Sequence, residues 1–381
     1  MNRRDFTRIT GLAALAMHAV PGASAATMLP NERVPQPSVP LGVGNHSLRA
    51  WRPNAMELID FAIEHRLDSV QFNTLRPFER MDDQHLEKIR NHAKAHDISI
   101  YVGVGSISEK SDKFNDRHGN ARTLVKEGIR VARALESPVL GVRIGVLEDR
   151  YSGGGIKPKM EEVVNLMRSY RGPVSDAGIK FAFENHAGDM RTEELLELID
   201  ETGSDICGAF FDPGNAIYAM EDPKPAMEML GNLIVCCSAR DVVIWQTDDG
   251  AGFQWTAVGE GMMDYTFFTE FLRKNSPGVP IHLEIISNSP RSIPYLTDEY
   301  WKGFPELKAR GIIDFLKMAR QGQPVDVARA PEEMDKKAFL MKNQEEELLR
   351  SIQYMREECG AGMDWEKPSS TSELPVQLRS I

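Results

Sequence analysis

Residues 179–186 read IKFAFENH, an apolar run that ends in acidic and polar side chains, and three later stretches have the same form. They are GAFFDPGN (208–215), LIVCCSARD (233–241) and IHLEI (281–285). In a parallel α/β barrel, the carboxyl ends of the strands converge on one mouth. The pattern therefore predicts that Glu184, Asp212 and Glu284 lie together, although a hundred residues separate the first from the last.

Three carboxylates that converge in this way repel one another unless a cation or shared protons compensate their charge. Oxygen-rich clusters of this kind are typical ligands of hard divalent cations. The sequence therefore predicts a metal site formed by Glu184, Asp212 and Glu284.

Short apolar runs alternate with longer amphipathic stretches over residues 38–323, which is the size and order of a (β/α)₈ TIM barrel. An open, doubly wound sheet has the same local pattern. LGVGNHSLRAW, which follows the first expected strand, lacks the GxGxxG spacing of such a sheet's phosphate loop. We therefore expect a closed barrel. The other strands are expected at 40–44, 69–73, 98–105 and 138–145.

The composition changes in residues 324–381. MDKKAFLMKNQEEELLRSIQYMREEC (334–359) predicts one charged helix, with Leu340, Leu348, Ile352 and Met355 along an apolar stripe. We expect a C-terminal helical extension, followed by a polar tail. The extension either packs on the outside of the barrel or forms a dimerisation arm in a homo-oligomer, and the sequence leaves both open.

Residues 1–26, MNRRDFTRITGLAALAMHAVPGASAA, resemble a twin-arginine export signal. The Arg3-Arg4 pair is followed by a weakly apolar stretch and by an Ala23-Ser24-Ala25 cleavage signature. The apolar part is too short for a stable membrane anchor. We expect export by the twin-arginine machinery and a mature chain that begins near Ala26, in the periplasm or outside the cell.

The composition, 41% hydrophobic and 27% charged over 381 residues, is that of an ordinary globular protein. The formal net charge of −11 disfavours a protein that wraps nucleic acid. The four cysteines include no CxxC pair, which predicts buried free thiols rather than a disulfide framework or a structural zinc site.

FENH, FDPGN, VGEGMMDY (258–265) and HLEI occur in the order found in the xylose-isomerase-like superfamily of sugar isomerases and epimerases. The chain resembles that superfamily over residues 38–323. The resemblance implies a divalent metal held by a Glu, an Asp, a His and a Glu from strands five to eight. By position these are Glu184, Asp212, the seventh-strand residue and Glu284.

The seventh strand departs from the superfamily's pattern. Its motif has the form His-x-Lys-Asp, whereas this chain has Ser238-Ala239-Arg240-Asp241. A hydroxyl is a far poorer ligand than an imidazole, so both loss of the metal and a rebuilt site stay open. His186, His282 and Asn215 are the nearby replacements, and Mn²⁺ or Mg²⁺ would suit such an oxygen-rich site.

Further polar residues are expected at strand ends around the same mouth, where they would bind sugar hydroxyls or hydrogen bond within loops. Trp51, Trp245 and Trp255 are expected in βα loops, where they would stack on a sugar ring or pack the loops. Arg240 and Asp241 are expected to form a local pair. The candidate substrate-binding residues are His46, Asn73, Arg143, His186, Asn215, Ser238 and Arg240.

The resemblance implies abstraction of a proton beside a carbonyl of a sugar or keto-sugar through a metal-stabilised enediolate. Glu184 and Glu284 would exchange the proton as general base and acid, giving an epimerase or an isomerase. Two alternatives stay open: a keto-glycoside lyase or hydratase with the same first step, and a non-catalytic sugar-binding protein. Apurinic endonuclease activity is disfavoured by the few histidines at strand ends and by the net charge.

Overall fold

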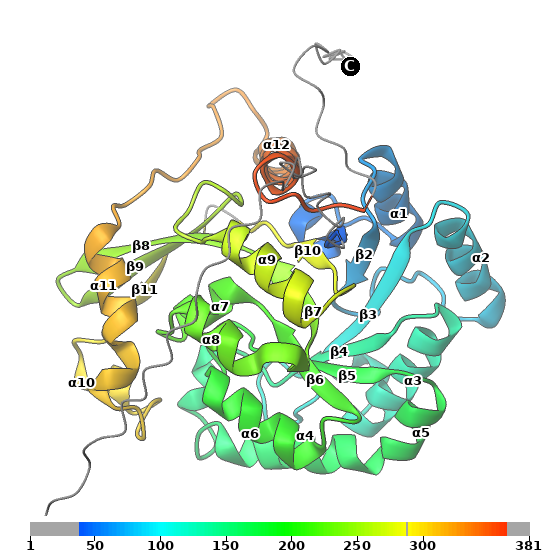
Figure 1. The fold of residues 1–381 in the computed structure, drawn as a ribbon, viewed down its shortest axis with the longest axis horizontal. Helices are drawn as coiled ribbons and strands as arrows, with labels where there is room; N and C mark the ends of the chain where they lie inside the picture. The colour runs from blue at the N-terminus through cyan, green and yellow to red at the C-terminus, as the bar shows by residue number, and fades with distance from the viewer. Residues whose placement is uncertain (1–37, 287–288, 364–381) are drawn as a thin grey trace, which may run out of the picture. The chain divides into compact units, whose positions relative to one another are not determined.

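Residues 38–286 and 289–363 are described by a computed structural model, so the expected export signal lies outside the described residues. In this part of the chain eight parallel strands close into a barrel, as the sequence predicts (Figure 1). Their order around the barrel is β1-β10-β7-β6-β5-β4-β3-β2. The barrel strands are β1 (Leu41–Gly44), β2 (Ser69–Phe72), β3 (Ser99–Ser106), β4 (Val139–Arg143), β5 (Lys180–Glu184), β6 (Cys207–Phe211), β7 (Ile234–Ala239) and β10 (Ile281–Leu283).

Strand β10 closes the barrel by pairing with both β1 and β7. Ile281 lies in register with Leu41 on one side and with Cys237 on the other. Parallel pairing around the whole ring places the carboxyl end of every barrel strand at one mouth. The residues that directly follow β5, β6, β7 and β10 are therefore brought together.

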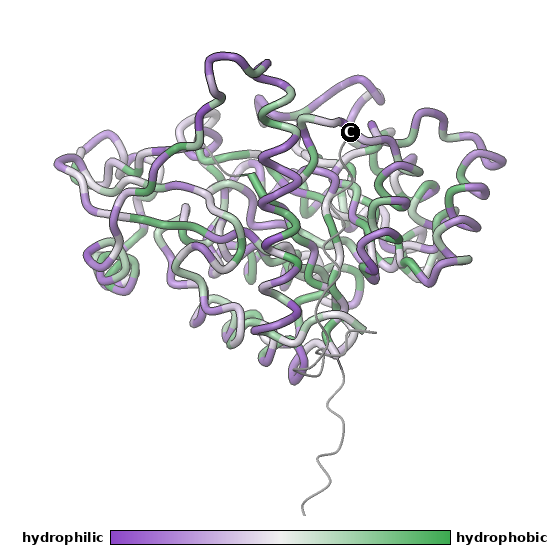
Figure 2. The backbone as a smooth tube through the Cα atoms, turned by 90° about the horizontal axis from the view of Figure 1, so that it is seen from above, coloured by the Kyte–Doolittle hydropathy of each residue, from purple (hydrophilic) through white to green (hydrophobic). Residues whose placement is uncertain are grey.

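Helices surround the barrel and bury one apolar face each. In α6, Leu195, Leu198 and Ile199 are buried, which is the spacing of an amphipathic helix. Figure 2 shows hydrophobic and hydrophilic residues alternating along these helices. The helices before the last barrel strand are α1 (Ala55–Glu64), α2 (Asp83–Lys94), α3 (Ala121–Ala134), α4 (Lys157–Ser169), α5 (Arg171–Asp176), α6 (Thr192–Thr202), α7 (Pro213–Tyr218), α8 (Pro223–Leu230) and α9 (Tyr265–Asn275).

A second sheet lies beside the barrel, where the sequence interpretation expected only a loop. β8 (Asp241–Thr247) and β9 (Gly250–Thr256) form an antiparallel hairpin, and β11 (Arg291–Ile293) pairs with β9. The expectation that Trp245 and Trp255 lie in βα loops was therefore wrong, because both are in strands of this hairpin. The hairpin begins one residue after Arg240, so the chain leaves the barrel wall abruptly at the end of β7.

The last helices belong to two different hydrophobic cores. Phe315 and Ala319 of α11 (Ile313–Gln321), which follows the short α10 (Asp298–Trp301), pack with the second sheet. Leu348 and Ile352 of α12 (Lys336–Glu357) join the barrel core, together with Met355. The predicted C-terminal helix is thus present and packs on the barrel, near β10 and the turn after β1.

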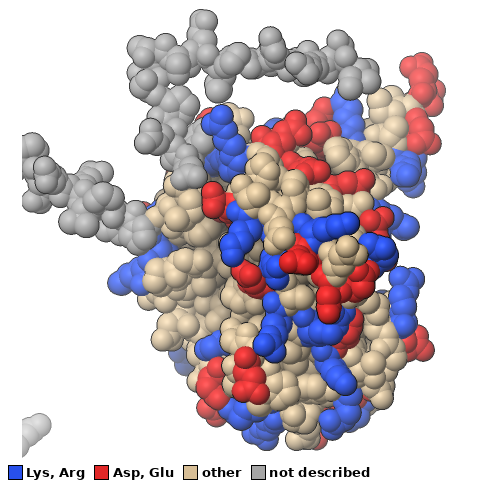
Figure 3. Space-filling view, turned by 90° about the vertical axis from the view of Figure 1, so that its right-hand side faces the viewer, with Lys and Arg blue, Asp and Glu red and all other residues tan. Residues whose placement is uncertain are grey.

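The surface and the cysteines agree with a globular protein. Cys207, Cys236, Cys237 and Cys359 are all free and buried, as predicted. Figure 3 shows acidic and basic side chains interspersed over the face that carries α1 to α3, with no broad basic area on that face. Among the described residues, every helix is either too short or too polar to span a bilayer.

Candidate functional site at the barrel mouth

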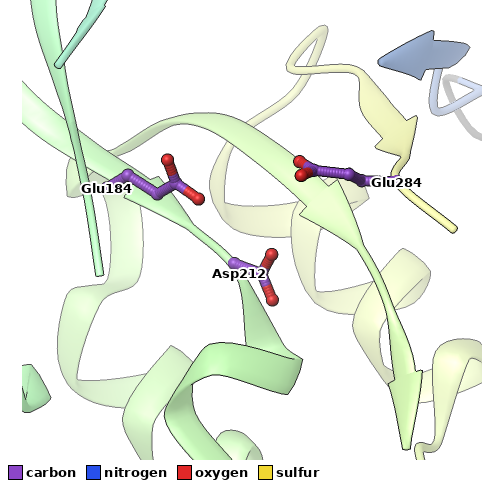
Figure 4. A group of neighbouring side chains, drawn as sticks. All are labelled: Glu184, Asp212 and Glu284. Atoms are coloured by element: carbon purple, nitrogen blue, oxygen red, sulfur yellow. The ribbon is translucent and has the colours of Figure 1, made fainter. Parts of the chain in front are cut away.

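Glu184, Asp212 and Glu284 converge at the carboxyl ends of β5, β6 and β10, as the sequence predicts (Figure 4). One carboxylate oxygen from each lies within 4.8 Å of the others. All three side chains are buried. Three buried carboxylates at this separation require compensating positive charge or bound protons.

Local structure positions each of them. Glu184 is the last residue of β5, and Glu284 directly follows β10. Asp212 is the N-cap of α7, and its Oδ1 accepts a hydrogen bond of 2.9 Å from the backbone N–H of Asn215. The DPGN segment therefore starts a helix rather than forming an isolated turn, because Pro213 is favourable in the first helical turn.

The guanidinium of Arg240 lies among the three carboxylates. Its Nε is 2.9 Å from Asp212 Oδ2, and its Nη2 is 3.8 Å from Glu184 Oε1. The same Nη2 donates a hydrogen bond to Glu284 Oε1. The Arg240 side chain is only 5% exposed, so this cation is part of the buried site.

Neutral side chains add hydrogen bonds to each carboxylate. Ser238 Oγ donates to Asp212 Oδ2 over 2.7 Å. Asn73 Nδ2 donates to Glu284 Oε2 over 3.2 Å, and Asn215 Nδ2 donates to Glu184 Oε1 over 3.4 Å. Three predicted substrate-binding residues therefore hydrogen bond to the acidic cluster.

The two glutamates differ in their electrostatic surroundings. Burial raises the pKa of Glu184 to about 8, despite the nearby guanidinium of Arg143, with its Nη1 3.5 Å from Glu184 Oε2. Burial raises the pKa of Glu284, but Arg240, His46, the Asn73 hydrogen bond and Arg143 together lower the pKa of that carboxyl below its ordinary value. One glutamate is thus held protonated near neutral pH and the other ionised.

Arg240 is held by its own neighbours. The hydroxyl of Tyr265 donates to the Arg240 carbonyl oxygen over 2.7 Å, and the Arg240 Cζ lies 5.2 Å from the centre of the Trp255 ring. The expected local pair of Arg240 with Asp241 does not form. Asp241 instead accepts hydrogen bonds from the backbone N–H groups of the 259–263 loop and of Val242.

The remaining predicted residues lie around the cluster. His46 lies on the turn after β1, and its Nδ1 is 3.7 Å from Glu284 Oε1. His186 donates from Nδ1 to the Gly145 carbonyl oxygen, which leaves its Nε2 as an acceptor. His282 does not contribute, because its ring lies in the barrel interior between Ser69 Oγ and the Cys237 carbonyl oxygen.

Two features of the site were missed at the level of sequence. Asn185 fixes the backbone of Asp212: its Oδ1 accepts from the Asp212 N–H over 2.8 Å and its Nδ2 donates to the Asp212 carbonyl over 2.9 Å. A small recess, with room for about one water molecule, also lies beside Arg143 and Glu184. Its wall includes Gly103, Gly105 and Gly141 of β3 and β4, and the repeated glycines of YVGVG were the signal for it.

The sequence profile described as "Xylose isomerase-like TIM barrel" matches residues 59–317. The chain belongs to the xylose isomerase-like TIM barrel family. The match covers most of the barrel, including β5, β6, β7 and β10.

Individual known proteins are only distantly similar to the chain. The 3-oxo-isoapionate decarboxylase of Pectobacterium atrosepticum is 22% identical over 53% of this chain and 66% of its own length. The chain thus spans less than two thirds of the length of the curated relatives it matches. Among solved structures, D-psicose 3-epimerase with D-fructose is 15% identical, with a TM-score of 0.55 over 84% of this chain and all of that chain.

A zinc-bound IOLI protein has the same fold, with 15% identity and a TM-score of 0.51 over 73% of this chain and 95% of that chain.

By themselves, the three carboxylates of the present barrel could also bind a metal ion. The complete cluster does not fit one, because the Arg240 guanidinium already contacts the oxygens that an ion would take. Ser238, at the superfamily's histidine position, donates its hydrogen to Asp212 and offers no imidazole.

Proposed function

We propose that this barrel is a sugar-modifying enzyme that abstracts a proton beside a carbonyl of a sugar or keto-sugar, as an epimerase or isomerase does. The observation that carries the proposal is the convergence of buried Glu184 and Glu284 on one guanidinium at the barrel mouth. Burying carboxyl groups costs desolvation free energy, and a site that only binds sugar hydroxyls does not need them.

The two glutamates are suited to opposite roles in proton transfer. Glu284 is kept ionised by Arg240, so it is the base that takes the proton from carbon. The electron pair of that C–H bond moves toward the carbonyl, whose oxygen becomes negatively charged. Glu184, which burial keeps protonated near neutral pH, returns a proton to carbon. Return to the other face gives an epimer. Return to the neighbouring carbon, with transfer of that carbon's hydroxyl proton to the former carbonyl oxygen, gives an isomer.

The polar lining of the recess beside Arg143 and Glu184 suits the hydroxyl groups of a small carbohydrate. Gln71 and Asn73 line it and supply amide groups that can hydrogen bond to hydroxyls. The similar proteins, a D-psicose 3-epimerase and a 3-oxo-isoapionate decarboxylase, also support a carbonyl-bearing carbohydrate. In this cluster the Arg240 guanidinium supplies the positive charge that the sequence interpretation expected from Mn²⁺ or Mg²⁺.

A keto-glycoside lyase or hydratase is the second candidate, and Ser238 is the observation that favours it. Elimination starts with the same proton abstraction, but the intermediate then expels a leaving group. Such an enzyme need not hold its substrate as the superfamily's histidine-containing site does, so it would tolerate Ser238 at the histidine position. The expected twin-arginine signal agrees with either candidate. We propose that the protein acts outside the cytoplasm on a free sugar, an oxidised sugar or a glycoside.

The test is turnover of a panel of ketoses and 3-keto-glycosides followed by ¹H NMR. The wild-type protein should produce an epimer, an isomer or an elimination product from at least part of the panel. A sugar that binds, as judged by a thermal shift, but is never converted would instead identify a non-catalytic sugar-binding protein. Released aglycone without epimer would identify the lyase.

A further inference from the structure

The position at which the superfamily carries a metal-binding histidine is Ser238 in this chain, and Arg240 two residues later reaches into the acidic cluster. We propose that the Arg240 guanidinium replaces the divalent cation, so that this barrel uses an arginine-centred site. The inference rests on the proposed proton-transfer function, which it deepens, but its test is separate from that of the function.

The contacts of Arg240 are those expected of a central cation. Its Nε lies 2.9 Å from Asp212 Oδ2, while its Nη2 contacts Glu284 and lies 3.8 Å from Glu184. A guanidinium presents several N–H donors in a fixed plane and stays charged at every physiological pH. One residue therefore contacts all three carboxylates that the resemblance assigns to a metal.

The surrounding side chains favour this arrangement over a metal ion. Ser238, Asn73 and Asn215 each present an O–H or N–H hydrogen to a carboxylate of the cluster. These hydrogens stabilise a carboxylate but cannot themselves coordinate a cation. A divalent ion on the same oxygens would also lie against the positive charge of Arg240, which opposes binding.

Arg240 is built into the fold at this position. Its carbonyl oxygen is held by Tyr265, and its guanidinium lies over Trp255. A methyl group added to Gly214 would meet the Trp255 ring at 2.3 Å and the Arg240 carbonyl oxygen at 3.1 Å. The short helix after β6 therefore packs tightly behind the arginine, and only glycine fits there.

The replacement has a consequence for the substrate. A guanidinium stabilises the enediolate oxygen through N–H donors, without the Lewis acidity of a divalent ion. The proton that Glu284 removes must therefore come from a carbon that is already acidified. This condition is met by a carbon next to a ketone, as in a 3-keto-sugar, whose C–H electrons pass to the ketone oxygen and return to carbon on reprotonation.

The test is metal uptake by the purified mature protein, measured as metal content and as thermal shift with Mn²⁺, Mg²⁺, Co²⁺ and Zn²⁺. The wild-type protein should contain only trace metal, and no ion should raise its Tm. The double variant Ser238→His/Arg240→Met should take up Mn²⁺ in stoichiometric amount, with a rise in Tm of several degrees on addition of the ion. Arg143→Met, which removes a guanidinium from the edge of the cluster, is the matched control and should take up none.

Stoichiometric metal in the wild-type protein, with a thermal shift that Arg240→Met does not change, would overturn the proposal. A double variant that folds but binds no Mn²⁺ would also contradict it. If the double variant does not fold, the metal content of the wild-type protein decides. None of these outcomes depends on turnover, so the proton-transfer function stands or falls separately.

Discussion

Glu184 and Asp241 are both buried carboxyl groups near the barrel mouth, but they are compensated in different ways. Asp241 accepts backbone hydrogen bonds from Val242 at 2.8 Å and from the 259–263 loop at 2.9 to 3.1 Å. Glu184 has only the Asn215 amide at 3.4 Å and guanidinium nitrogens at 3.5 Å and 3.8 Å. Backbone amides hold Asp241 in place, whereas longer side-chain contacts leave Glu184 incompletely compensated.

The difference separates a structural acid from a reactive one. The oxygens of a carboxylate that accept several backbone N–H groups are not available to a substrate. Asp241 instead connects the 259–263 loop to the end of β7. A carboxyl group that burial keeps protonated can give its proton to a substrate. We therefore expect substitutions in the Glu184 cluster to reduce turnover, and substitutions around Asp241 to reduce stability.

The largest expected effect is on turnover in Glu284→Gln and Glu184→Gln. Each variant should lose about 10²–10⁴-fold in kcat on a converted keto-sugar, because each removes one proton-transfer group. Circular dichroism should show an unchanged fold. Glu221→Gln is the matched control, since this buried carboxylate bonds to Thr192 and not to the acidic cluster. Full activity in either site variant would remove that glutamate from the mechanism.

A pH-dependent difference in stability is expected between Glu184→Gln and the wild-type protein. Between the ordinary pKa of 4.5 and the raised pKa of about 8, only the unfolded state releases the Glu184 proton. The wild type should therefore lose stability relative to the variant as the pH rises from 5 to 8, by at most about 1.4 kcal/mol per pH unit. Urea unfolding at four pH values measures this, and a constant difference would show that Glu184 is ionised in the fold.

Asp241→Asn tests the structural half of the comparison. The amide cannot accept all the backbone hydrogen bonds that the carboxylate accepts, so the free energy of unfolding should fall by about 1–3 kcal/mol. Urea denaturation gives the value. Turnover per folded molecule should fall much less than in Glu284→Gln, and an equal loss of turnover would mean that Asp241 is more than an anchor.

The smallest effect is expected for Ser238→Ala. The variant loses one hydrogen bond to Asp212, which costs about 0.5–1.5 kcal/mol of stability. Because the hydroxyl does not hold a metal in our account, turnover should stay within about tenfold of the wild-type value. A loss as large as that of Glu284→Gln would give Ser238 a direct role in the reaction.

The barrel and its acidic cluster could be predicted because they depend on local patterns and topology. Apolar runs mark the strands, and parallel closure alone brings Glu184, Asp212 and Glu284 to one mouth. The β8–β9 hairpin was missed because TDDG and its neighbouring glycines have the composition of a loop, which hid the strands on either side.

The role of Arg240 could not be predicted, because it depends on the course of one side chain. The sequence places Arg240 next to Asp241, which suggests a local pair. In the fold Asp241 is satisfied by backbone amides, so Arg240 is free to turn toward the carboxylates of three other strand ends. Tertiary structure decides which groups become the partners of Arg240 and Asp241, and the spacing of residues in the sequence does not indicate the outcome.

The most direct test of the account is solvent deuterium exchange by metal-stripped protein. A keto-sugar that the protein converts would be incubated in D₂O with chelator-treated enzyme, and its exchange beside the ketone followed by ¹H NMR. We predict that deuterium enters that position at the untreated rate and that Glu284→Gln abolishes the exchange. Exchange that stops on chelation and returns with Mn²⁺ would contradict an arginine-centred site.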